Sequence, residues 1–364
     1  MTIVLRAILI YFLIALNVLT LLFYTKLVPR HILGIESSCD DTAAAVLCNG
    51  KVLSNVIANQ AIHEAYGGVV PELASRAHQQ NIVPVVQQAI AKANIDKNQL
   101  KAVAFTQGPG LMGSLLVGAS FAKSLAMSLD IPLIAVNHMQ AHLLAHFIDD
   151  PEQTPPSFPF IGVTISGGHT QIVKVSSYFD MKIIGETLDD AIGEAFDKSG
   201  KMLGLPYPAG PIIDKKAQFG DGNTFTFSKP KVENLNFSFS GLKTGILYFL
   251  QKQVKHNPEF VSQNMNNLCA SIQQTIVEIL MDKIHSAVQQ TGIKEVAIGG
   301  GVSANSSIRK ALLSAKDENG WKVYLPKFEF TTDNAAMIAI VGDLLYQQQK
   351  FSPLDASALA RTSF

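Results

Sequence analysis

This sequence of 364 residues contains few cysteines and carries no net charge. Its three cysteines, Cys39, Cys48 and Cys269, form no CxxC pair and cannot all be paired, which excludes a disulfide scaffold and favours a reducing cytosol. Lys and Arg number 29, as do Asp and Glu, so a globally basic nucleic-acid binder is excluded, although a local basic patch is not. Only 16% of residues are charged and 48% are hydrophobic, which excludes disorder as the main state and fits two lobes with ample cores.

A long apolar run is found at the N-terminus. Residues 7–24 carry one strongly polar side chain, Asn17, and reach the lower length limit for spanning a bilayer. Lys26 and Arg30 follow, so a signal anchor with these charges on the cytoplasmic side is one interpretation. We favour a later translation start, because a complete soluble-enzyme pattern begins at His31 and needs nothing upstream.

Beyond this run, short apolar strands alternate with helical segments, which predicts an α/β fold. The first half contains strands at 31–35, 43–47 and 51–60, a helical stretch at 71–93, a strand at 102–106, a helix at 114–129, a strand at 131–136 and a helix at 138–147. Pro84 interrupts the helical stretch, so we expect two helices or a kink there. A proline-rich linker at 149–159 then separates the two halves.

The second half repeats this order, which suggests an ancient duplication. It contains strands at 160–165 and 170–175, a helical segment at 185–205, a strand at 295–298, a helix at 305–314, a strand at 322–325 and a C-terminal helix at 331–347. The expected domains are an N-terminal extension at 1–30, a first lobe of 31–150 plus 331–364, and a second lobe of 151–330 with a basic helical insertion at about 198–255.

Two histidines spaced four residues apart form the first candidate site. His138 and His142 would share one helix face and could share a metal, although two unrelated surface histidines fit the spacing equally well. Met139 stands where an HExxH protease has its glutamate, which disfavours zinc-protease chemistry. Asp333 is a suitable third ligand or, alternatively, a helix N-cap. Two histidines and a carboxylate with open positions suit Fe²⁺ or Zn²⁺.

Three glycine-containing turns form further candidates. Gly167 and Gly168 lie between two strands, where backbone N–H groups could approach an anion, but a plain hairpin turn explains them equally well. Three consecutive glycines at 299–301 make a flat surface for an adenosine, with Asn305 available to hydrogen-bond it. The GxGxxG pattern at 108–113 is weak as a dinucleotide fingerprint, because no acidic residue closes a second strand about 20 residues on. We interpret it as helix–sheet packing beside a ligand.

Charge patterns give two more candidates. Asp190, Glu194 and Asp197 fall on one helix face, which is either solvated or, through Asp197, directed at ribose hydroxyls. Residues 198–255 contain nine lysines and three acids, with phenylalanines interleaved. An RNA-binding surface has this composition, and so does an ordinary solvated face over a small core.

These motifs occur together in the order that is typical of one family. They are Gly34–Thr42, the HxxxH pair, Ser166–Thr170, Gly185–Ala191, Pro206–Pro211, Phe239–Thr244 and Gly299–Asn305. From His31 to at least Gly342 the chain resembles the TsaD family of tRNA N6-adenosine threonylcarbamoyltransferases, and the bacterial type most of all. Asp41 replaces the family's usual glutamate and Ala209 its usual glycine.

The resemblance implies an actin/Hsp70/sugar-kinase (ASKHA) fold, with two RNase H-like lobes and a cleft between them. It implies that His138, His142 and Asp333 hold one divalent metal ion per chain. We expect Fe²⁺, with Zn²⁺ or Mg²⁺ as alternatives. The residues implied to contact the nucleotide-like substrate, threonylcarbamoyl-AMP, are Thr164, Ile165, Ser166, Gly167, Gly168, Asp197, Gly210 and Asn305. The product would be threonylcarbamoyladenosine at position 37 of tRNAs that read codons beginning with A.

The expected chemistry is metal-assisted acyl transfer, in which the adenine amine attacks the carbamoyl carbonyl and AMP leaves. Asp40 is our candidate for orienting or deprotonating the amine, with Asp41 in support. The implied partners are tRNA, a paralogous non-catalytic TsaB-type subunit and a small P-loop ATPase of TsaE type. A homodimer is an alternative assembly. We expect a cytoplasmic protein, membrane-bound only if residues 7–24 are a real anchor. A small-molecule kinase of the same fold is the main alternative.

Overall fold

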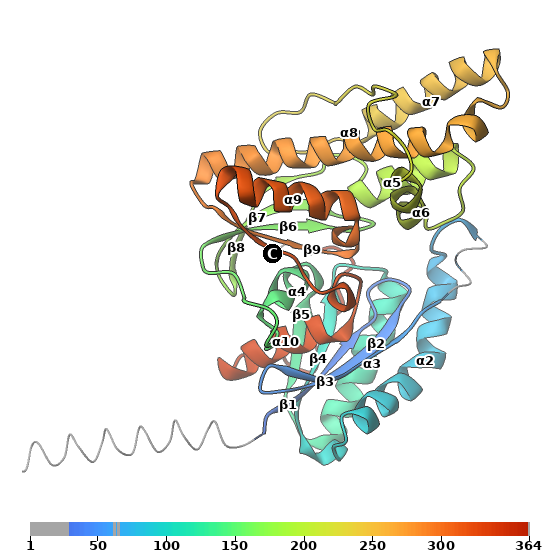
Figure 1. The fold of residues 1–364 in the computed structure, drawn as a ribbon. Coiled ribbons are helices and arrows are strands. Elements are labelled where there is room, and N and C mark those ends of the chain that lie inside the picture. The colour runs from blue at the N-terminus through green and yellow to red at the C-terminus, as the bar shows by residue number, and fades with distance from the viewer. Residues whose placement is uncertain (1–28, 61–62, 64–65, 363–364) are drawn as a thin grey trace, which may run out of the picture.

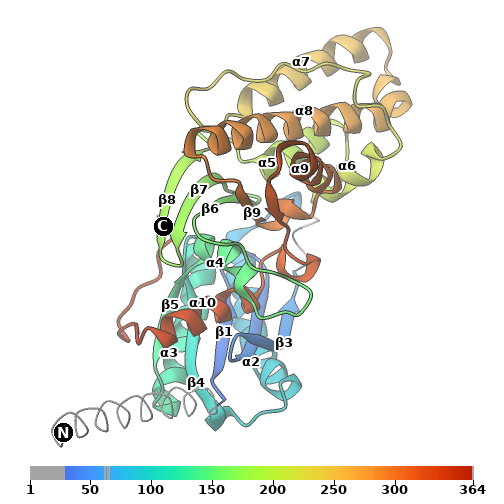
Figure 2. The same cartoon turned by 60° about the vertical axis from the view of Figure 1, so that its left-hand side comes forward.

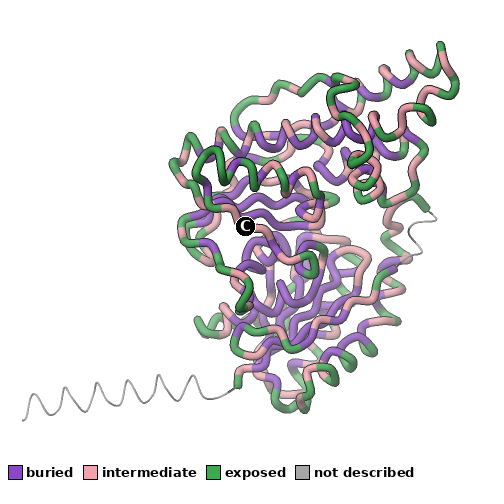
Figure 3. Tube along the Cα trace, viewed as in Figure 1, coloured by how far each residue is buried: buried purple, intermediate pink, exposed green. Residues whose placement is uncertain are grey.

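The computed structural model describes residues 29–60, 63 and 66–362, and the apolar run at 7–24 lies outside them. Two β-sheets, each with its own helices, lie one above the other in Figure 1. We call the part built on the first sheet lobe I and the part built on the second sheet lobe II. Figure 3 shows that the strands of both lobes are mostly buried, whereas the far ends of the upper helices are largely exposed.

Lobe I contains a five-stranded sheet with the strand order β3-β2-β1-β4-β5. Its strands are β1 (His31–Glu36), β2 (Thr42–Cys48), β3 (Lys51–Ala58), β4 (Leu100–Gly108) and β5 (Leu133–Asn137). Leu33 and its neighbours on one face pack under α2 (Pro71–Lys92) and α3 (Met112–Leu129). Ile32 and its neighbours on the other face pack under α10 (Ala335–Gln347). Because both faces are covered, β1 is apolar at nearly every position.

Lobe II repeats this sheet, with the order β8-β7-β6-β9-β10. Its strands are β6 (Phe160–Ile165), β7 (Thr170–Ser177), β8 (Asp180–Glu186), β9 (Glu295–Gly299) and β10 (Lys322–Tyr324). Its helices are α5 (Ile192–Met202), α6 (Ala209–Ala217), α7 (Ser240–His256), α8 (Phe260–Thr291) and α9 (Ser306–Asn319). In both sheets the first three strands are antiparallel, and the fourth and fifth run parallel to the first.

A helix follows the fifth strand of each sheet, and the first of them lies between the lobes, whereas the second lies against the sheet of lobe I (Figure 2). After β5 the chain enters α4 (His138–Leu144), which contacts β6 and β9 of lobe II. After β10 it enters α10, which returns to the sheet of lobe I. The two helices also contact each other. Single turns of 3₁₀ helix occur at η2 (Lys97–Gln99), η3 (Ala145–Phe147), η4 (Gly301–Ala304) and η5 (Phe328–Phe330).

Two expectations about helices need correction. Of the two possibilities at Pro84, two helices or a kink, the first is wrong, because α2 runs through Pro84 as one element. Pro84 and Gln80 are both exposed, so the carbonyl that loses its helical donor can face water. The segment expected to be helical from 185 begins instead as strand β8, which completes the second meander, and α5 starts only at Ile192. The helix α7 falls within the basic helical insertion expected at about 198–255, whereas the long helix α8 was not anticipated.

Within the described chain, α3 is long and apolar enough to cross a bilayer by length and composition. It packs on β4 and α2, as the core helices of many globular proteins do.

Candidate active site

The candidate metal ligands lie at the starts of α4 and α10. His138 is the first residue of α4, and His142 lies one turn later on the same face. Asp333 directly precedes Asn334, the N-cap of α10. Asn137 caps α4 in the same way, accepting hydrogen bonds from the N–H groups of Met139 and Gln140. Equivalent capped helix starts thus bring together residues almost 200 positions apart in the sequence.

The ligand atoms of these three residues lie within 4.8 Å of one another. Nε2 of His138 and Nε2 of His142 are each 3.4 Å from Oδ1 of Asp333. Both ring nitrogens of His142 are buried and lack a hydrogen-bond partner among the described residues. Buried polar atoms without partners are costly, and a cation would satisfy Nε2. The donor set of two imidazoles and one carboxylate therefore fits a divalent metal.

A buried carboxylate orients His138. Oε2 of Glu36 lies 3.0 Å from Nδ1 of His138 and accepts a 2.6 Å hydrogen bond from the Thr106 hydroxyl. Oε1 accepts a bond from the Ser38 backbone N–H. With Nδ1–H donated to Glu36, Nε2 is the nitrogen that lies towards Asp333 and would ligate a metal, which is the usual arrangement behind a metal-bound histidine.

Electrostatics in this cluster follow from burial and close charges. Burial alone would raise the pKa of Glu36 and lower that of His138. Their mutual attraction, with Asp333 acting on His138, reverses both effects, so the pKa of Glu36 is lowered and that of His138 is raised. Burial lowers the pKa of His142, which keeps this imidazole neutral and able to ligate.

The residues between β1 and β2, 37–41, form what we call the carboxylate loop. Asp40 and Asp41 are both partly exposed there. Burial, followed by the charges of Asp40 and Asp333, raises the pKa of Asp41 to about 7. A carboxyl group with this pKa can accept and release a proton near neutral pH. Burial, followed by the charge of Asp197 and then that of Asp40, raises the pKa of Tyr207 to about 12, which places Asp40 within electrostatic range of lobe II.

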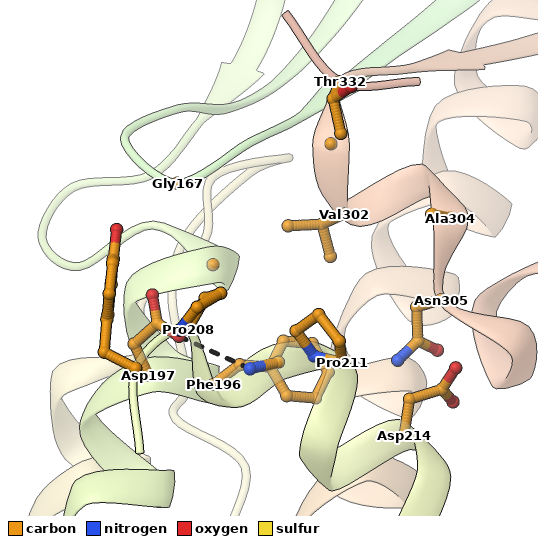
Figure 4. A pocket seen from close by; sticks show the side chains of 14 residues that line it. Gly167, Phe196, Asp197, Pro208, Pro211, Asp214, Val302, Ala304, Asn305 and Thr332 are labelled. Carbon is orange, nitrogen blue, oxygen red and sulfur yellow. Dashed lines mark hydrogen bonds between the residues drawn. The ribbon is translucent and has the colours of Figure 1, made fainter. Parts of the chain in front are cut away.

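A pocket of about 390 Å³ opens in lobe II (Figure 4). Asp197 lies on one side of it, and Asn305 and Asp214 lie on the other. The residues that line it are Gly167, Gly193, Phe196, Asp197, Tyr207, Pro208, Gly210, Pro211, Asp214, Gly301, Val302, Ala304, Asn305 and Thr332. This volume suits a nucleotide-sized ligand.

The structure brings only some of the expected substrate contacts to this pocket. Gly167, Asp197, Gly210 and Asn305 line it. Thr164 and Ile165 are buried in β6, and Ser166 and Gly168 are not among the lining residues. A Cβ atom added to Gly167 or Gly168 would meet nothing within 4 Å, so the backbone of this turn is open to a ligand.

Asp197 and Asn305 already carry structural hydrogen bonds. One oxygen of Asp197 accepts from the N–H groups of Ala209 and Gly210 at the start of α6, at 2.8 and 3.4 Å. The side chain of Asn305 caps α9 through Ile308 N–H and donates to Gln273. One amide hydrogen of Asn305 remains for a ligand, so binding by this residue would reuse a capping side chain.

The pocket adjoins the three candidate metal ligands, His138, His142 and Asp333, which we call the metal cluster. Thr332 lines the pocket, and the next residue is Asp333. A Cβ atom at Gly299 would lie 2.6 Å from the carbonyl oxygen of His142, and one at Gly300, where φ is +92°, would lie 2.4 Å from that of Ile165. Gly299 therefore lets the end of β9 lie directly against the helix that carries the histidines, and Gly300 lets the following turn lie against the end of β6.

Sequence reasoning overlooked Glu36, Tyr207 and Asp214. Glu36 is an ionisable residue at the end of an apolar strand, and this pattern could have singled it out. Asp214 lies four residues after Gly210 on α6 and therefore on the same helix face. The loop at 108–113 was interpreted as helix–sheet packing beside a ligand, and the structure shows a close approach of Gly110 to the carboxylate loop, where a Cβ would lie 2.3 Å from Ser38 O.

The excess of lysines at 198–255 is partly neutralised by acids outside that window. Lys198 and Lys243 both pair with Asp190, and Lys229 pairs with Glu278 and Asp282. The composition of that segment alone therefore overstates its positive surface.

Comparisons with known proteins agree with this geometry. A sequence profile described as "TsaD: tRNA N6-adenosine threonylcarbamoyltransferase" matches residues 51–340. Proteins named tRNA N6-adenosine threonylcarbamoyltransferase from Christiangramia forsetii and Riemerella anatipestifer are 66% and 63% identical over 334 and 330 residues, which cover 92% and 91% of this chain and 98% and 97% of theirs.

Among solved structures, full-length HypF in a phosphate- and nucleotide-bound form aligns with a TM-score of 0.56 at 14% identity, over 89% of this chain and 47% of its own. HypF of T. kodakarensis aligns with a TM-score of 0.55 at 16% identity, over 91% of this chain and 50% of its own. These likenesses concern the fold, which is the ASKHA fold. The chain belongs to the TsaD family of tRNA N6-adenosine threonylcarbamoyltransferases.

Proposed function

We propose that the chain transfers the threonylcarbamoyl group from threonylcarbamoyl-AMP to N6 of adenosine 37 in tRNAs reading codons that begin with A, at the junction of the metal cluster and the lobe II pocket. The observation that carries this proposal is their direct adjacency, with Thr332 in the pocket and Asp333 in the cluster. A nucleotide leaving group in the pocket would place the carbonyl to be attacked beside the cluster.

His138, His142 and Asp333 are the residues that would hold the metal, Fe²⁺ being our first choice, with Zn²⁺ or Mg²⁺ as alternatives. A divalent cation bound there supplies Lewis-acid polarisation of the carbonyl oxygen. Glu36 accepts a hydrogen bond from Nδ1–H of His138 and so leaves Nε2 as the nitrogen that would ligate the metal.

The pocket is proposed to bind the adenylate and to orient it. The open backbone at Gly167 and Gly168 would approach its anionic groups, and the spare amide hydrogen of Asn305 its adenine. Asp197, whose pKa is raised by burial despite its two backbone donors, would accept from a ribose hydroxyl with its second oxygen. Thr164, Ile165 and Ser166 act here by shaping the end of β6 and the turn that follows it.

The carboxylate loop is proposed to handle the incoming amine. The amine of adenine is a poor nucleophile, so positioning supplies much of the rate. Asp40 would orient the amine, because it lies within electrostatic range of Tyr207, which lines the pocket. Asp41 would take up its proton, because its pKa of about 7 suits a base at neutral pH.

The proposed setting is the cytoplasm. The partners that we propose are tRNA, a TsaB-type paralogue and a TsaE-type P-loop ATPase, with a homodimer as the other assembly to be examined. A membrane location would require an anchor at residues 7–24. These assignments come from the family resemblance.

The test is complementation. The host's own enzyme is depleted, the full chain or a chain starting at Pro29 is expressed, and threonylcarbamoyladenosine in digested tRNA is quantified by mass spectrometry. Starting at Pro29 keeps Arg30, whose guanidinium pairs with the buried Asp343. Restoration by the wild type but not by His142→Ala supports the proposal. Conversion of a small molecule with ATP, without tRNA, would favour the kinase alternative. Failure of both chains even with the source organism's partners would overturn the proposal.

A further inference from the structure

One histidine of α2 contacts both ends of the segment that carries the two loop aspartates. His78 is fully buried. Its Nε2 lies 3.1 Å from the carbonyl oxygen of Cys39, and its Nδ1 lies 2.8 Å from the hydroxyl of Thr42. A carbonyl oxygen can only accept, so Nε2 carries the proton and Nδ1 accepts from the Thr42 hydroxyl. One imidazole therefore binds the residue before Asp40 and the residue after Asp41.

We propose that His78 is a positioning residue that clamps the carboxylate loop and holds Asp40 and Asp41 in place for the transfer. This inference rests on the roles proposed above for the two aspartates. His78 itself acts only through the backbone of Cys39 and the side chain of Thr42.

The surroundings of His78 suit a rigid clamp. The helix α2 is anchored in the core of lobe I through Ile82, Val85 and Val86. Burial lowers the pKa of His78, so the ring is neutral and has one donor and one acceptor, which matches its two partners. Closer to β1, the loop is fixed independently, because the backbone N–H of Leu111 donates to Ser38 O at 2.7 Å.

A purely structural role for this contact is the alternative, and the chain offers a matched control. Ser54 of β3 is also buried, and its hydroxyl donates to Ala89 O of the same helix at 2.7 Å. This contact joins the same helix to the same sheet but does not involve the carboxylate loop. Ser54→Ala thus removes a comparable buried hydrogen bond and leaves the aspartates untouched.

The experiment measures transfer by the full chain with threonylcarbamoyl-AMP and tRNA. Thr42→Val, which keeps the side-chain volume and removes the hydroxyl, is expected to lower kcat about 10- to 100-fold. The KM for both substrates and the bound metal should be unchanged, because the pocket and the metal ligands are intact. Thr42→Ser should restore kcat, and Ser54→Ala should lower the Tm by as much as Thr42→Val does while keeping kcat.

A double-mutant cycle adds a second measurement. His78→Gln retains a donor towards Cys39 and loses the acceptor for Thr42. If the two side chains act through one hydrogen bond, His78→Gln combined with Thr42→Val should lower kcat little further than either change alone. Independent, additive losses would overturn the clamp.

The remaining outcomes separate this inference from the proposed function. Full kcat in Thr42→Val, or an equal loss of kcat in Ser54→Ala, overturns the clamp alone, provided that Asp40→Ala and Asp41→Ala are inactive. Full activity in both of these aspartate variants overturns the roles proposed for the carboxylates, and the clamp with them.

Discussion

The carboxylate loop of lobe I and the turn at 166–169 of lobe II occupy the same position in two copies of one sheet. Each connects the first and second strands of its meander, β1 to β2 and β6 to β7. The first carries two aspartates and is fixed at several points by hydrogen bonds. The second carries two glycines whose surroundings are open. A duplicated frame thus presents two carboxyl groups from the turn of lobe I and unobstructed backbone from the turn of lobe II.

The helices α4 and α10 extend this comparison. Helix N-termini favour anions, so a cation at the meeting of two such ends needs compensating negative charge. Asp333 precedes α10, and Glu36 lies behind His138. The histidines lie on α4 and the aspartate directly precedes α10, two helices that contact each other, so the cluster requires chain segments from before and after lobe II.

The largest expected effect comes from breaking this shared cluster. Asp333→Ala leaves the two imidazoles without the carboxylate ligand, and we expect loss of bound metal and a fall in transfer of about 10³-fold or more. Metal content by mass spectrometry and threonylcarbamoyladenosine formation are measured together. Asp180→Ala, which removes an exposed carboxylate from β8, should change neither. Full metal content in Asp333→Ala would show that the ligand set is wrong.

The duplicated α/β pattern could be predicted from sequence because most of its strands are short apolar runs; β8, which contains charged and exposed residues, was missed for the same reason. The HxxxH pair and the glycine runs could be recognised because each is a pattern of residues that are close together in the sequence. Glu36 acts on a histidine more than 100 residues away, and no periodicity reports such a contact. The ion pairs of Lys229 likewise join distant segments, so counting charge along the chain misjudged that surface.

The next largest effect is expected from Glu36, the carboxylate of lobe I that orients His138. Glu36→Gln keeps the size of the side chain but removes the charge that holds Nδ1–H of His138, and we expect metal affinity to fall about 10- to 100-fold. Competition with a chromogenic chelator measures it. Asp343→Asn is the matched control, because Asp343 is also a buried carboxylate, paired with Arg30 away from the cluster. Equal affinity in Glu36→Gln and wild type would contradict the orienting role.

Substitution in the turn at 166–169 of lobe II should weaken substrate binding without lowering the stability of the fold. A Cβ at Gly167 meets no protein atom, so Gly167→Ala should leave the Tm unchanged and raise the KM for threonylcarbamoyl-AMP roughly tenfold by obstructing close backbone approach. At Gly193 a Cβ would lie 2.6 Å from Ser166 O, so Gly193→Ala should lower the Tm. An unchanged KM in Gly167→Ala would mean that this turn is only a hairpin connection.

The smallest effect is a pH dependence confined to lobe I. Burial and then the charge of Asp40 raise the pKa of Asp41 to about 7, above its ordinary value, so the folded chain binds a proton that the unfolded chain has lost. Stability should therefore decline as pH rises from about 4 to about 7, by roughly 2 kcal/mol after allowance for partial exposure. Urea unfolding of metal-free wild type and Asp41→Asn at pH 5 and pH 8 tests this. The variant should lose less stability than the wild type between these values. Because Asp333 contributes to the raised pKa, adding metal should reduce the difference, and parallel profiles without metal would refute the assignment.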